Sequence, residues 1–261
     1  MQQDSSHAVL ITGSTSGIGL AIAHCFARAG HHVMLHGLAT PEEGRALCEA
    51  FSGYAGKVGF SSANIAEEQG CVQLAADTRE AIGNPSVLIN NAGIQFTAPA
   101  HEFPTDKWHQ ILAINLSAGF FLSRELLPAM RAGNWGRIIN IASVHGLVAS
   151  ENKAAYCAAK HGLVGLTKVL ALENADAGIT ANAICPGWVE TPLIQPQIES
   201  IAREQQIDIE SARAQLVGAK QPLARATGPE AIAELALYLC GSFAGTITGA
   251  ALPVDGGWSA Q

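Results

Sequence analysis

The chain has 261 residues, of which 48% are hydrophobic and only 14% are charged, and its formal net charge is -7. An average soluble domain has about 25% charged residues, and this composition excludes a disordered chain, a disulfide-rich miniprotein and a coiled coil. The negative charge argues against nucleic acid as a partner, because a nucleic-acid surface needs clustered Lys and Arg. At this length we expect one α/β domain over 1–261.

Apolar runs and helical patterns alternate along the chain. Apolar residues at helical spacing, with glycine near the end, predict helices over 17–30, 41–51 and 153–178. The alternation predicts a Rossmann-type doubly wound parallel sheet with helices on both faces, whose continuous apolar strands explain part of the charge deficit. The predicted strands are 8–12, 31–36, 86–91, 137–143 and 180–186, with a further short strand at 250–254.

We expect three regions within this single domain. Residues 8–190 form the dinucleotide-binding and catalytic core. Residues 191–222 are the richest in charged and Gln side chains, which predicts a surface segment near the site that acts as a lid. Residues 223–261 are expected to hold a helix, a strand and subunit contacts.

Cysteine spacing and apolar stretches bear on location. The six cysteines include no C-x-x-C pair, which predicts buried free thiols rather than a zinc or redox site. The first residues, MQQDSSH, lack the pattern of a signal peptide, so we expect a cytoplasmic protein. The uncharged stretch 235–254 is long enough to cross a membrane, but glycines and a proline interrupt it. We therefore expect a helix end, a loop and a strand there, no membrane partner and no metal site.

The first predicted strand leads directly into a glycine-rich turn, TGSTSGIG over 12–19, and then into a helix. Glycines let the backbone approach a pyrophosphate closely, and amides at a helix start favour negative charge. The spacing is G-x-x-x-G-x-G instead of the commoner G-x-G-x-x-G, and an ordinary structural turn can have the same pattern. The strand-to-helix context favours a dinucleotide site.

The end of the second strand indicates which dinucleotide binds. An acidic residue there accepts a hydrogen bond from the ribose 2′-hydroxyl of NAD, whereas a basic residue pairs with the 2′-phosphate of NADP. This chain has His36-Gly37-Leu38-Ala39, which provides neither signal. The glycine-rich turn also lacks a cation to neutralise a phosphate of about −2 charge, so we expect NAD in preference to NADP. His36 either contributes to this site or is a surface histidine without a role.

A catalytic pattern follows in three later segments: Asn90-Asn91-Ala92-Gly93 after a strand, Ser143 at the end of the next, and Tyr156-x-x-x-Lys160 on a helix. A tyrosine has an ordinary pKa of about 10 and is a poor base at neutral pH, but a cation one helical turn away stabilises its phenolate. Lys160 is placed to do this for Tyr156, which would then act as a base. Taken singly, these residues could also be a buried aromatic, a solvated charge and a hydrogen bond at a strand end.

These motifs together resemble the short-chain dehydrogenase/reductase family, and the resemblance covers essentially the whole chain. It implies that Ser143 hydrogen-bonds the reacting oxygen, that Lys160 also holds the nicotinamide ribose, and that Asn115 anchors a proton-relaying water. Where the family often has an aspartate near the adenine, this chain has Asn64, whose side-chain oxygen can still accept a hydrogen bond. The predicted cofactor contacts are Gly13, Thr15, Ser16, Gly17, Ile18, Gly37, Leu38, Asn64, Ile65, Asn91, Ala92, Gly93, Tyr156, Lys160, Pro186, Gly187, Val189 and Thr191.

Polar residues that the hydride chemistry does not require lie near these motifs, namely Gln95, His145, Lys153 and Gln197. In one pocket they would provide amide, imidazole and ammonium donors for a carboxylate, with the charge coming from Lys153. Trp188 and Trp258 would close the apolar side of that pocket. The alternatives are a surface charge for Lys153, loop and solvent contacts for the other polar residues, and plain packing for the tryptophans.

The segments NNAGIQ and KAAYCAAKHGLVGLTKV resemble those family members that act on a short 3-hydroxy acid. The resemblance implies reversible oxidation of (R)-3-hydroxybutyrate to acetoacetate with NAD, in a homotetramer whose apolar C-terminal region contacts other subunits. Two alternatives are a reductase of another ketone or a 3-oxoacyl substrate, which should prefer NADPH, and a non-catalytic dinucleotide-binding sensor or scaffold. The predicted substrate residues are Gln95, Ser143, His145, Lys153, Tyr156, Trp188, Gln197 and Trp258.

Overall fold

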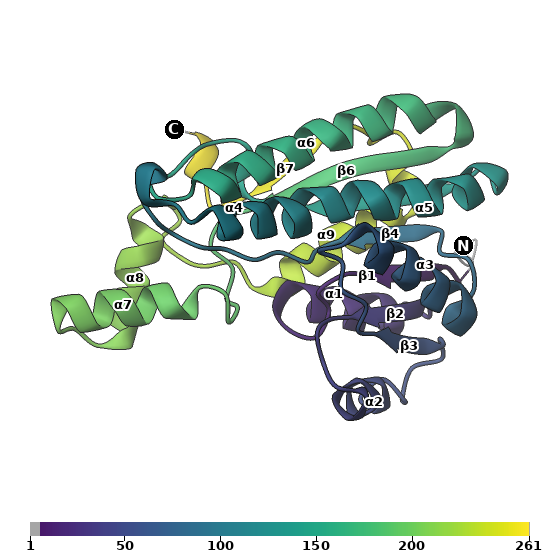
Figure 1. Ribbon diagram of the computed structural model, residues 1–261, viewed down its shortest axis with the longest axis horizontal. Coiled ribbons are helices and arrows are strands. Elements are labelled where there is room, and N and C mark those ends of the chain that lie inside the picture. The colour runs from purple at the N-terminus through teal and green to yellow at the C-terminus, as the bar shows by residue number, and fades with distance from the viewer. Residues whose placement is uncertain (1–5, 261) are drawn as a thin grey trace.

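Seven parallel strands form one sheet in the order β3-β2-β1-β4-β5-β6-β7 in the computed structural model, which describes residues 6–260 (Figure 1). The strand order reverses between β1 and β4, so the loops at their carboxyl ends diverge and leave a crevice there. The predicted fold class is confirmed. The strands are β1 (Ala8–Ile11), β2 (His32–His36), β3 (Val58–Ser61), β4 (Val87–Asn90), β5 (Gly136–Ile141), β6 (Ile179–Pro186) and β7 (Ala251–Val254).

Helices cover both faces of the sheet because successive strand residues point to opposite sides. Val9 and Ile11 of β1 join the core layer under α1 and α9, whereas Leu10 joins the layer under α3 and α5. The helices are α1 (Gly17–Arg28), α2 (Pro41–Glu49), α3 (Glu68–Ile82), α4 (Thr105–Leu112), α5 (Ala118–Ala132), α6 (Ala154–Asn174), α7 (Gln195–Gln205), α8 (Ile209–Gly218) and α9 (Pro229–Cys240).

Every predicted strand is present, with ends that differ by at most two residues. The helix predicted over 153–178 is α6, which ends at Asn174 and is followed by a short 3-10 turn that closes on Gly178 with φ 66°. The patterns in the sequence predict no bounds for β3, α3, α4, α5, α7 or α8. The strand β3 lies at the sheet edge and is only partly buried, so its residues do not form the continuous apolar run of the central strands.

One long helix runs through α4, a π-helical turn (Ala113–Ser117) and α5. Within residues 6–260 it is the one helix that is long and apolar enough to cross a membrane by length and composition. In the fold it packs against α3 and α6. The uncharged stretch 235–254 forms the end of α9, a loop and β7, which confirms that prediction.

The helices α7 and α8 pack against each other and extend from one end of the sheet (Figure 1). Their apolar residues, including Ile198 and Val217, form a buried cluster with Trp188 and Trp258. The segment 191–222 is therefore joined to the fold through these two tryptophans and through Val144.

All six cysteines are unpaired, as predicted, but only four of them are buried, because Cys48 and Cys157 are partly exposed. The described part of the chain contains no group of three or more His, Cys, Asp or Glu side chains that could hold a metal ion. Residues 1–5, on which the prediction of no signal peptide mainly rests, and Gln261 lie outside the described residues.

Candidate active site

A groove of about 580 Å³ crosses the carboxyl ends of the central strands. It is formed by the loops that follow β1, β2, β3, β4, β5 and β6, and every predicted cofactor contact lines it. Segments that are more than a hundred residues apart in sequence therefore meet at the crevice where the strand order reverses.

The glycine-rich turn forms one wall of this groove. Gly13 and Gly17 have φ values of 62° and 54°, and a Cβ at Gly13 would lie only 2.8 Å from Ala92 Cα. Ser16 precedes α1 without capping it by its side chain, and the first turn contains no acidic residue. The first amides of this helix thus remain available, and together with the positive end of the helix they fit a pyrophosphate.

Hydrogen bonds join this turn to the loop after β4. The Thr12 hydroxyl accepts from the main-chain N–H groups of Asn91 and Ala92, each at 3.0 Å. The Asn91 amide donates to the carbonyls of Thr12 and Gly13, each at 2.9 Å. The two sides of the groove are therefore held at a fixed separation.

His36 is buried at the end of β2, so the alternative that it lies on the surface is wrong. Its Nδ1 accepts from the Gly13 N–H at 3.2 Å, and its Nε2 donates to the Ala63 carbonyl at 2.9 Å. Burial lowers the pKa of this imidazole, which keeps it neutral. His36 joins the glycine-rich turn to the loop after β3, and it is therefore not a free cation for a 2′-phosphate.

Asn64 lies in the loop after β3 with both ends of its amide engaged. Its Oδ1 accepts from the Ala66 N–H at 3.2 Å, and its Nδ2 donates to Glu67 at 3.1 Å. A hydrogen bond to an adenine amine would have to use the second lone pair of Oδ1.

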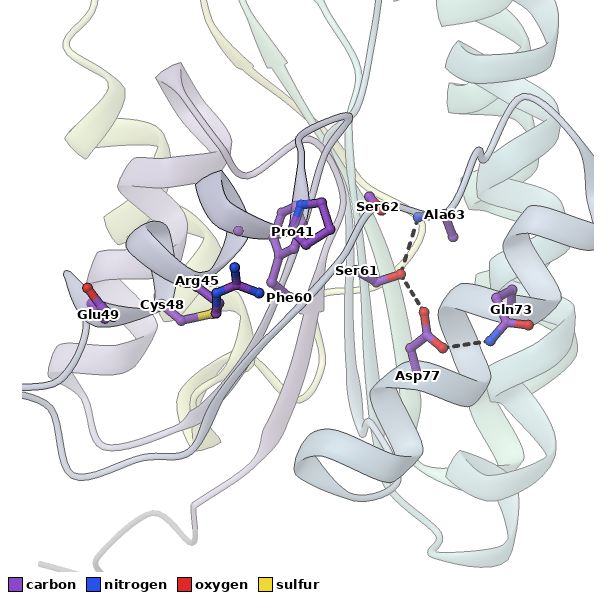
Figure 2. Close-up of a pocket in the computed structure, with 11 residues that line it drawn as sticks. Pro41, Arg45, Cys48, Glu49, Phe60, Ser61, Ser62, Ala63, Gln73 and Asp77 are labelled. Carbon is purple, nitrogen blue, oxygen red and sulfur yellow. Dashed lines mark hydrogen bonds between the residues drawn. The ribbon is translucent and has the colours of Figure 1, made fainter.

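A second pocket, of about 720 Å³, lies between α2, β3 and α3 and adjoins the groove at Ala63 (Figure 2). Three of its polar side chains bond to one another: Asp77 accepts from Ser61 and, at 2.6 Å, from Gln73. Arg45 is paired with Glu42 at 2.7 Å. The predicted cofactor contacts line the groove and not this second pocket.

Three of the four predicted catalytic residues, Ser143, Tyr156 and Lys160, line the groove. Tyr156 and Lys160 are one turn apart on α6, and the Lys160 ammonium lies 5.6 Å from the centre of the Tyr156 ring. Lys160 Nζ also donates to the Ile141 carbonyl at 2.8 Å, and Ser143 hydrogen-bonds the Tyr156 hydroxyl. Lys160 is only 3% exposed, so the alternative of a solvated helix charge is wrong.

Burial shifts the pKa values of both α6 residues, because it disfavours the charged form of each. It raises the pKa of Tyr156 to about 12, against the opposing effect of the hydrogen bond with Ser143. It lowers the pKa of Lys160 to about 8. An ammonium and a phenolate at this distance stabilise each other, so the Lys160 charge is the feature that makes Tyr156 usable as a base.

Asn115 lies within the π-helical turn, a rare helical form that is frequent at functional sites. Its Oδ1 accepts from the Ile94 N–H and its Nδ2 donates to the Ile94 carbonyl, both at 2.9 Å. The two bonds to the Ile94 backbone hold the side chain of Asn115 against the loop after β4.

The rings of His145, Trp258 and Trp188 contact one another in that order, and His145 contacts Tyr156. The His145 ring is nearly perpendicular to Tyr156 at 5.9 Å and to Trp258 at 5.2 Å between ring centres. Its Nε2 hydrogen-bonds Ser150 at 2.9 Å. Burial lowers the pKa of His145 to about 4, so the imidazole is neutral at pH 7.

Lys153 is 7% exposed, and the alternative of a surface charge is wrong. Its Nζ lies 5.2 Å from the centre of the Trp188 ring, and the Trp188 and Trp258 rings are 5.7 Å apart. Among residues 6–260 no carboxylate forms a salt bridge with Lys153, and burial lowers the pKa of its ammonium. A buried ammonium without a counterion is costly, which favours an anionic ligand beside it.

Gln95 and Gln197 are not joined to these residues by any hydrogen bond or ring contact within the described residues. Gln95 follows Ile94 in the loop after β4, and Gln197 lies in the first turn of α7; both are half-buried. The sequence analysis missed Gln221, a buried residue whose side chain accepts from the Trp188 N–H. Its only local signal is its place before Pro222, at the end of the predicted lid.

Known proteins resemble this chain along nearly its whole length. Residues 13–259 match the family described as enoyl-(acyl carrier protein) reductase. The D-beta-hydroxybutyrate dehydrogenases of Cupriavidus necator and Rhizobium meliloti are each 45% identical over 253 residues, covering 97% of this chain and 97% and 98% of their own. A crystal structure of L-sorbose reductase from Gluconobacter frateurii, complexed with NADPH and L-sorbose, has a TM-score of 0.93 and 28% identity and covers 100% of both chains. The parallel sheet, the Ser143, Tyr156 and Lys160 arrangement and these matches establish that the chain belongs to the short-chain dehydrogenase/reductase family of oxidoreductases.

Proposed function

We propose that this oxidoreductase catalyses the reversible, NAD-dependent oxidation of (R)-3-hydroxybutyrate to acetoacetate. The observation that carries the proposal is the buried Lys153 ammonium, which has no carboxylate partner among the described residues. It lies against Trp188, and the ring contacts continue from Trp188 through Trp258 and His145 to Tyr156. The names of the relatives with 45% identity agree with this substrate. A reductase of a 3-oxoacyl thioester would need no cation at that position, and a non-catalytic sensor would not need the complete Asn115, Ser143, Tyr156 and Lys160 set.

The catalytic residues divide the chemistry between them. Ser143 hydrogen-bonds the reacting oxygen, and Tyr156 takes the hydroxyl proton as general base. Lys160 stabilises the phenolate by its charge and holds the nicotinamide ribose, while the amides of the glycine-rich turn hold the pyrophosphate. The bound nicotinamide supplies the acceptor for the hydride. Asn115 would hold the water through which the proton leaves Tyr156.

The substrate carboxylate binds on the side of Lys153 on this proposal. The ammonium supplies the charge, and the neutral His145 and the free amides of Gln95 and Gln197 supply hydrogen bonds. Trp188 and Trp258 face the alkyl part of the acid. The segment 191–222 closes over this pocket as a lid.

Lys153→Ala tests the assignment of the carboxylate site. We expect kcat/KM for 3-hydroxybutyrate to fall roughly 100-fold or more, because the carboxylate would be left buried without its partner. On an uncharged secondary alcohol such as 2-butanol the loss should be only a few-fold. Both rates are measured by NADH absorbance. Lys168→Ala, an exposed position on α6, is the matched control, and an equal loss on both substrates would contradict the assignment.

The preference for NAD is supported by the surroundings of the exposed Leu38. The N-terminus of α2 follows within two residues and is closed by a capping box, in which Glu43 accepts from the Thr40 N–H at 2.8 Å. Arg45, on the same helix, is bound to Glu42. At this helix start Arg45 and the Glu43 N–H are therefore already bonded, and the carboxylates of Glu42 and Glu43 repel a 2′-phosphate.

Leu38→Arg is expected to raise kcat/KM with NADP⁺ about 10-fold or more, because a hydrogen bond to a charged group contributes roughly 1.5–3 kcal/mol. The rate with NAD⁺ should change by less than about three-fold. Ala46→Arg, an exposed position further along α2, adds the same charge away from the groove and serves as the control. A similar gain in both variants would mean that the ribose does not lie near Leu38.

We also propose a homotetramer and a cytoplasmic location, the latter supported by the six unpaired cysteines. Apolar side chains are exposed on two surfaces: Leu172 and Phe120 on α6 and α5, and Tyr238 and Phe243 near the C-terminal strand. Phe243 is 91% exposed and Leu172 is 82% exposed. Exposed apolar groups of this size suit subunit contacts, and one of the two surfaces lies in the uncharged C-terminal region.

A further inference from the structure

We propose that Gln221 is a positioning residue that limits the length of the hydroxy acid by holding Trp188 in place. The inference rests on the proposed function and adds a specificity determinant to it. Gln221 lies between α8 and Pro222, at the end of the segment 191–222, and is only 1% exposed. A buried amide must have partners for both its oxygen and its nitrogen, and the identity of these partners is what connects it to the substrate pocket.

The amide of Gln221 connects two loops. Its Oε1 accepts from the Trp188 main-chain N–H, and its Nε2 donates to the Arg225 carbonyl at 2.7 Å. Its own N–H donates to the Val217 carbonyl at 2.9 Å, which fixes it to the end of α8. The end of the predicted lid is thereby attached to the loop after β6.

Two glycines lie against the Gln221 amide, and a side chain at either of them would occupy the space of this amide. A Cβ at Gly187 would lie only 2.4 Å from Gln221 Oε1, and a Cβ at Gly256 would lie 2.8 Å from its Nε2. Gly187 precedes Trp188, and Gly256 lies two residues before Trp258. The side chain of Gln221 therefore packs directly against both of the backbone segments that carry the tryptophans.

Trp188 depends on these backbone contacts for its position. Its N–H donates to Gln221 and its carbonyl accepts from the Thr227 N–H at 2.8 Å. Its indole Nε1 is buried and has no hydrogen-bond partner within the described residues. Since no hydrogen bond fixes the ring itself, the main-chain bonds and the packing against Trp258 determine where the Trp188 ring lies beside Lys153.

On this inference the position of the Trp188 ring limits substrate length. The Lys153 ammonium and the Trp188 ring are 5.2 Å apart, so a carboxylate bound at Lys153 would lie beside this ring. In a 3-hydroxy acid two bonds separate the carboxyl carbon from the carbon whose hydroxyl Tyr156 would deprotonate, so only the remaining alkyl group varies. One methylene in a hydrophobic pocket changes specificity by about 10–200-fold if the pocket wall is rigid.

Gln221→Met tests the inference, because methionine fills a similar volume without either hydrogen bond. We expect the ratio of kcat/KM for 3-hydroxybutyrate to that for 3-hydroxyhexanoate to fall about 10-fold or more. The Kd for NADH, measured by fluorescence titration, should stay within about two-fold. A general loss of structure would lower both rates together and leave the ratio unchanged. Gln215→Met, at an exposed position on α8, is the matched control.

Two further variants keep the test decisive. Gln221→Asn is one methylene too short to reach both partners, and it should shift the ratio in the same direction if Gln221→Met does not fold. Gln221→Glu keeps an acceptor for the Trp188 N–H but places an oxygen instead of a donor against the Arg225 carbonyl, so it should lower the ratio in the same direction.

An unchanged ratio in folded Gln221→Met overturns the inference alone. A wild-type protein that oxidises neither acid refutes the proposed function and the inference with it.

Discussion

Tyr156→Phe is expected to lower kcat for 3-hydroxybutyrate about 10²–10⁴-fold, the range that a positioned acid–base group contributes. The phenyl ring keeps the perpendicular contact with His145 and the position over which the Lys160 ammonium lies. Only the hydroxyl that takes the substrate proton is lost. The Kd for NADH should therefore stay within about two-fold, because the glycine-rich turn and Lys160 are unaltered. Steady-state rates and a fluorescence titration of NADH measure the two quantities.

The control for this variant is Tyr54→Phe, which removes a hydroxyl that bonds His24 away from the groove. It should retain wild-type turnover. Turnover retained in Tyr156→Phe would show that another group is the base. A large loss of NADH affinity would show instead that the hydroxyl supports the groove itself.

Lys160→Met is expected to abolish most activity and to stabilise the protein in the absence of cofactor. At pH 7 the folded protein keeps a buried ammonium whose pKa is lowered to about 8 from 10.5, and a shift of that size corresponds to roughly 3 kcal/mol. Methionine avoids this cost of burial. The activity falls because the Tyr156 phenolate, whose pKa burial raises to about 12, loses the only charge beside it within the described site.

The stability difference should depend on pH with a definite sign. Between pH 8 and 10.5 the unfolded chain still binds a proton at Lys160 that the folded protein has released, so the stability of the wild type rises with pH. The advantage of Lys160→Met should therefore shrink from roughly 3 kcal/mol at pH 7 to under about 1 kcal/mol at pH 10. Urea unfolding of the cofactor-free protein at the two pH values measures it.

Lys168→Met replaces an exposed lysine on the same helix and should show no such pH dependence. A Lys160→Met variant that is less stable than the wild type at pH 7 would contradict the expectation. It would mean that the hydrogen bond from Lys160 to the Ile141 carbonyl outweighs the cost of burying the charge.

The parts of the fold and site that the sequence predicts are those encoded by local patterns. The central strands are continuous apolar runs, and the glycine-rich turn between β1 and α1 has a spacing that few other structures require. Tyr156 and Lys160 are related by a single helical turn, so their proximity follows from the helix alone. These features needed no knowledge of the rest of the chain.

The features that escaped prediction depend on contacts between distant segments. His36 bonds the main chain of Gly13 and Ala63, and Gln221 bonds that of Trp188 and Arg225. A backbone N–H or carbonyl is present at almost every position, so nothing in the sequence marks it as the partner of a particular side chain. The edge strand β3 escaped for a different reason, since its partial burial leaves no continuous apolar run.

The π-helical turn at Ala113–Ser117 makes the function of the site depend on the exact number of residues in the long helix. Each α-helical residue advances the chain by about 100°, and a π turn contains one residue more than an α turn, so α4 and α5 present faces that are out of phase. Ile111 accordingly packs against Ala155 and Ala159 of α6, while Leu122 packs under the sheet. Removing one residue here would restore a regular helix and turn one half away from its partners. An alignment gap at this position therefore signals a rearranged active site even where every catalytic residue is matched.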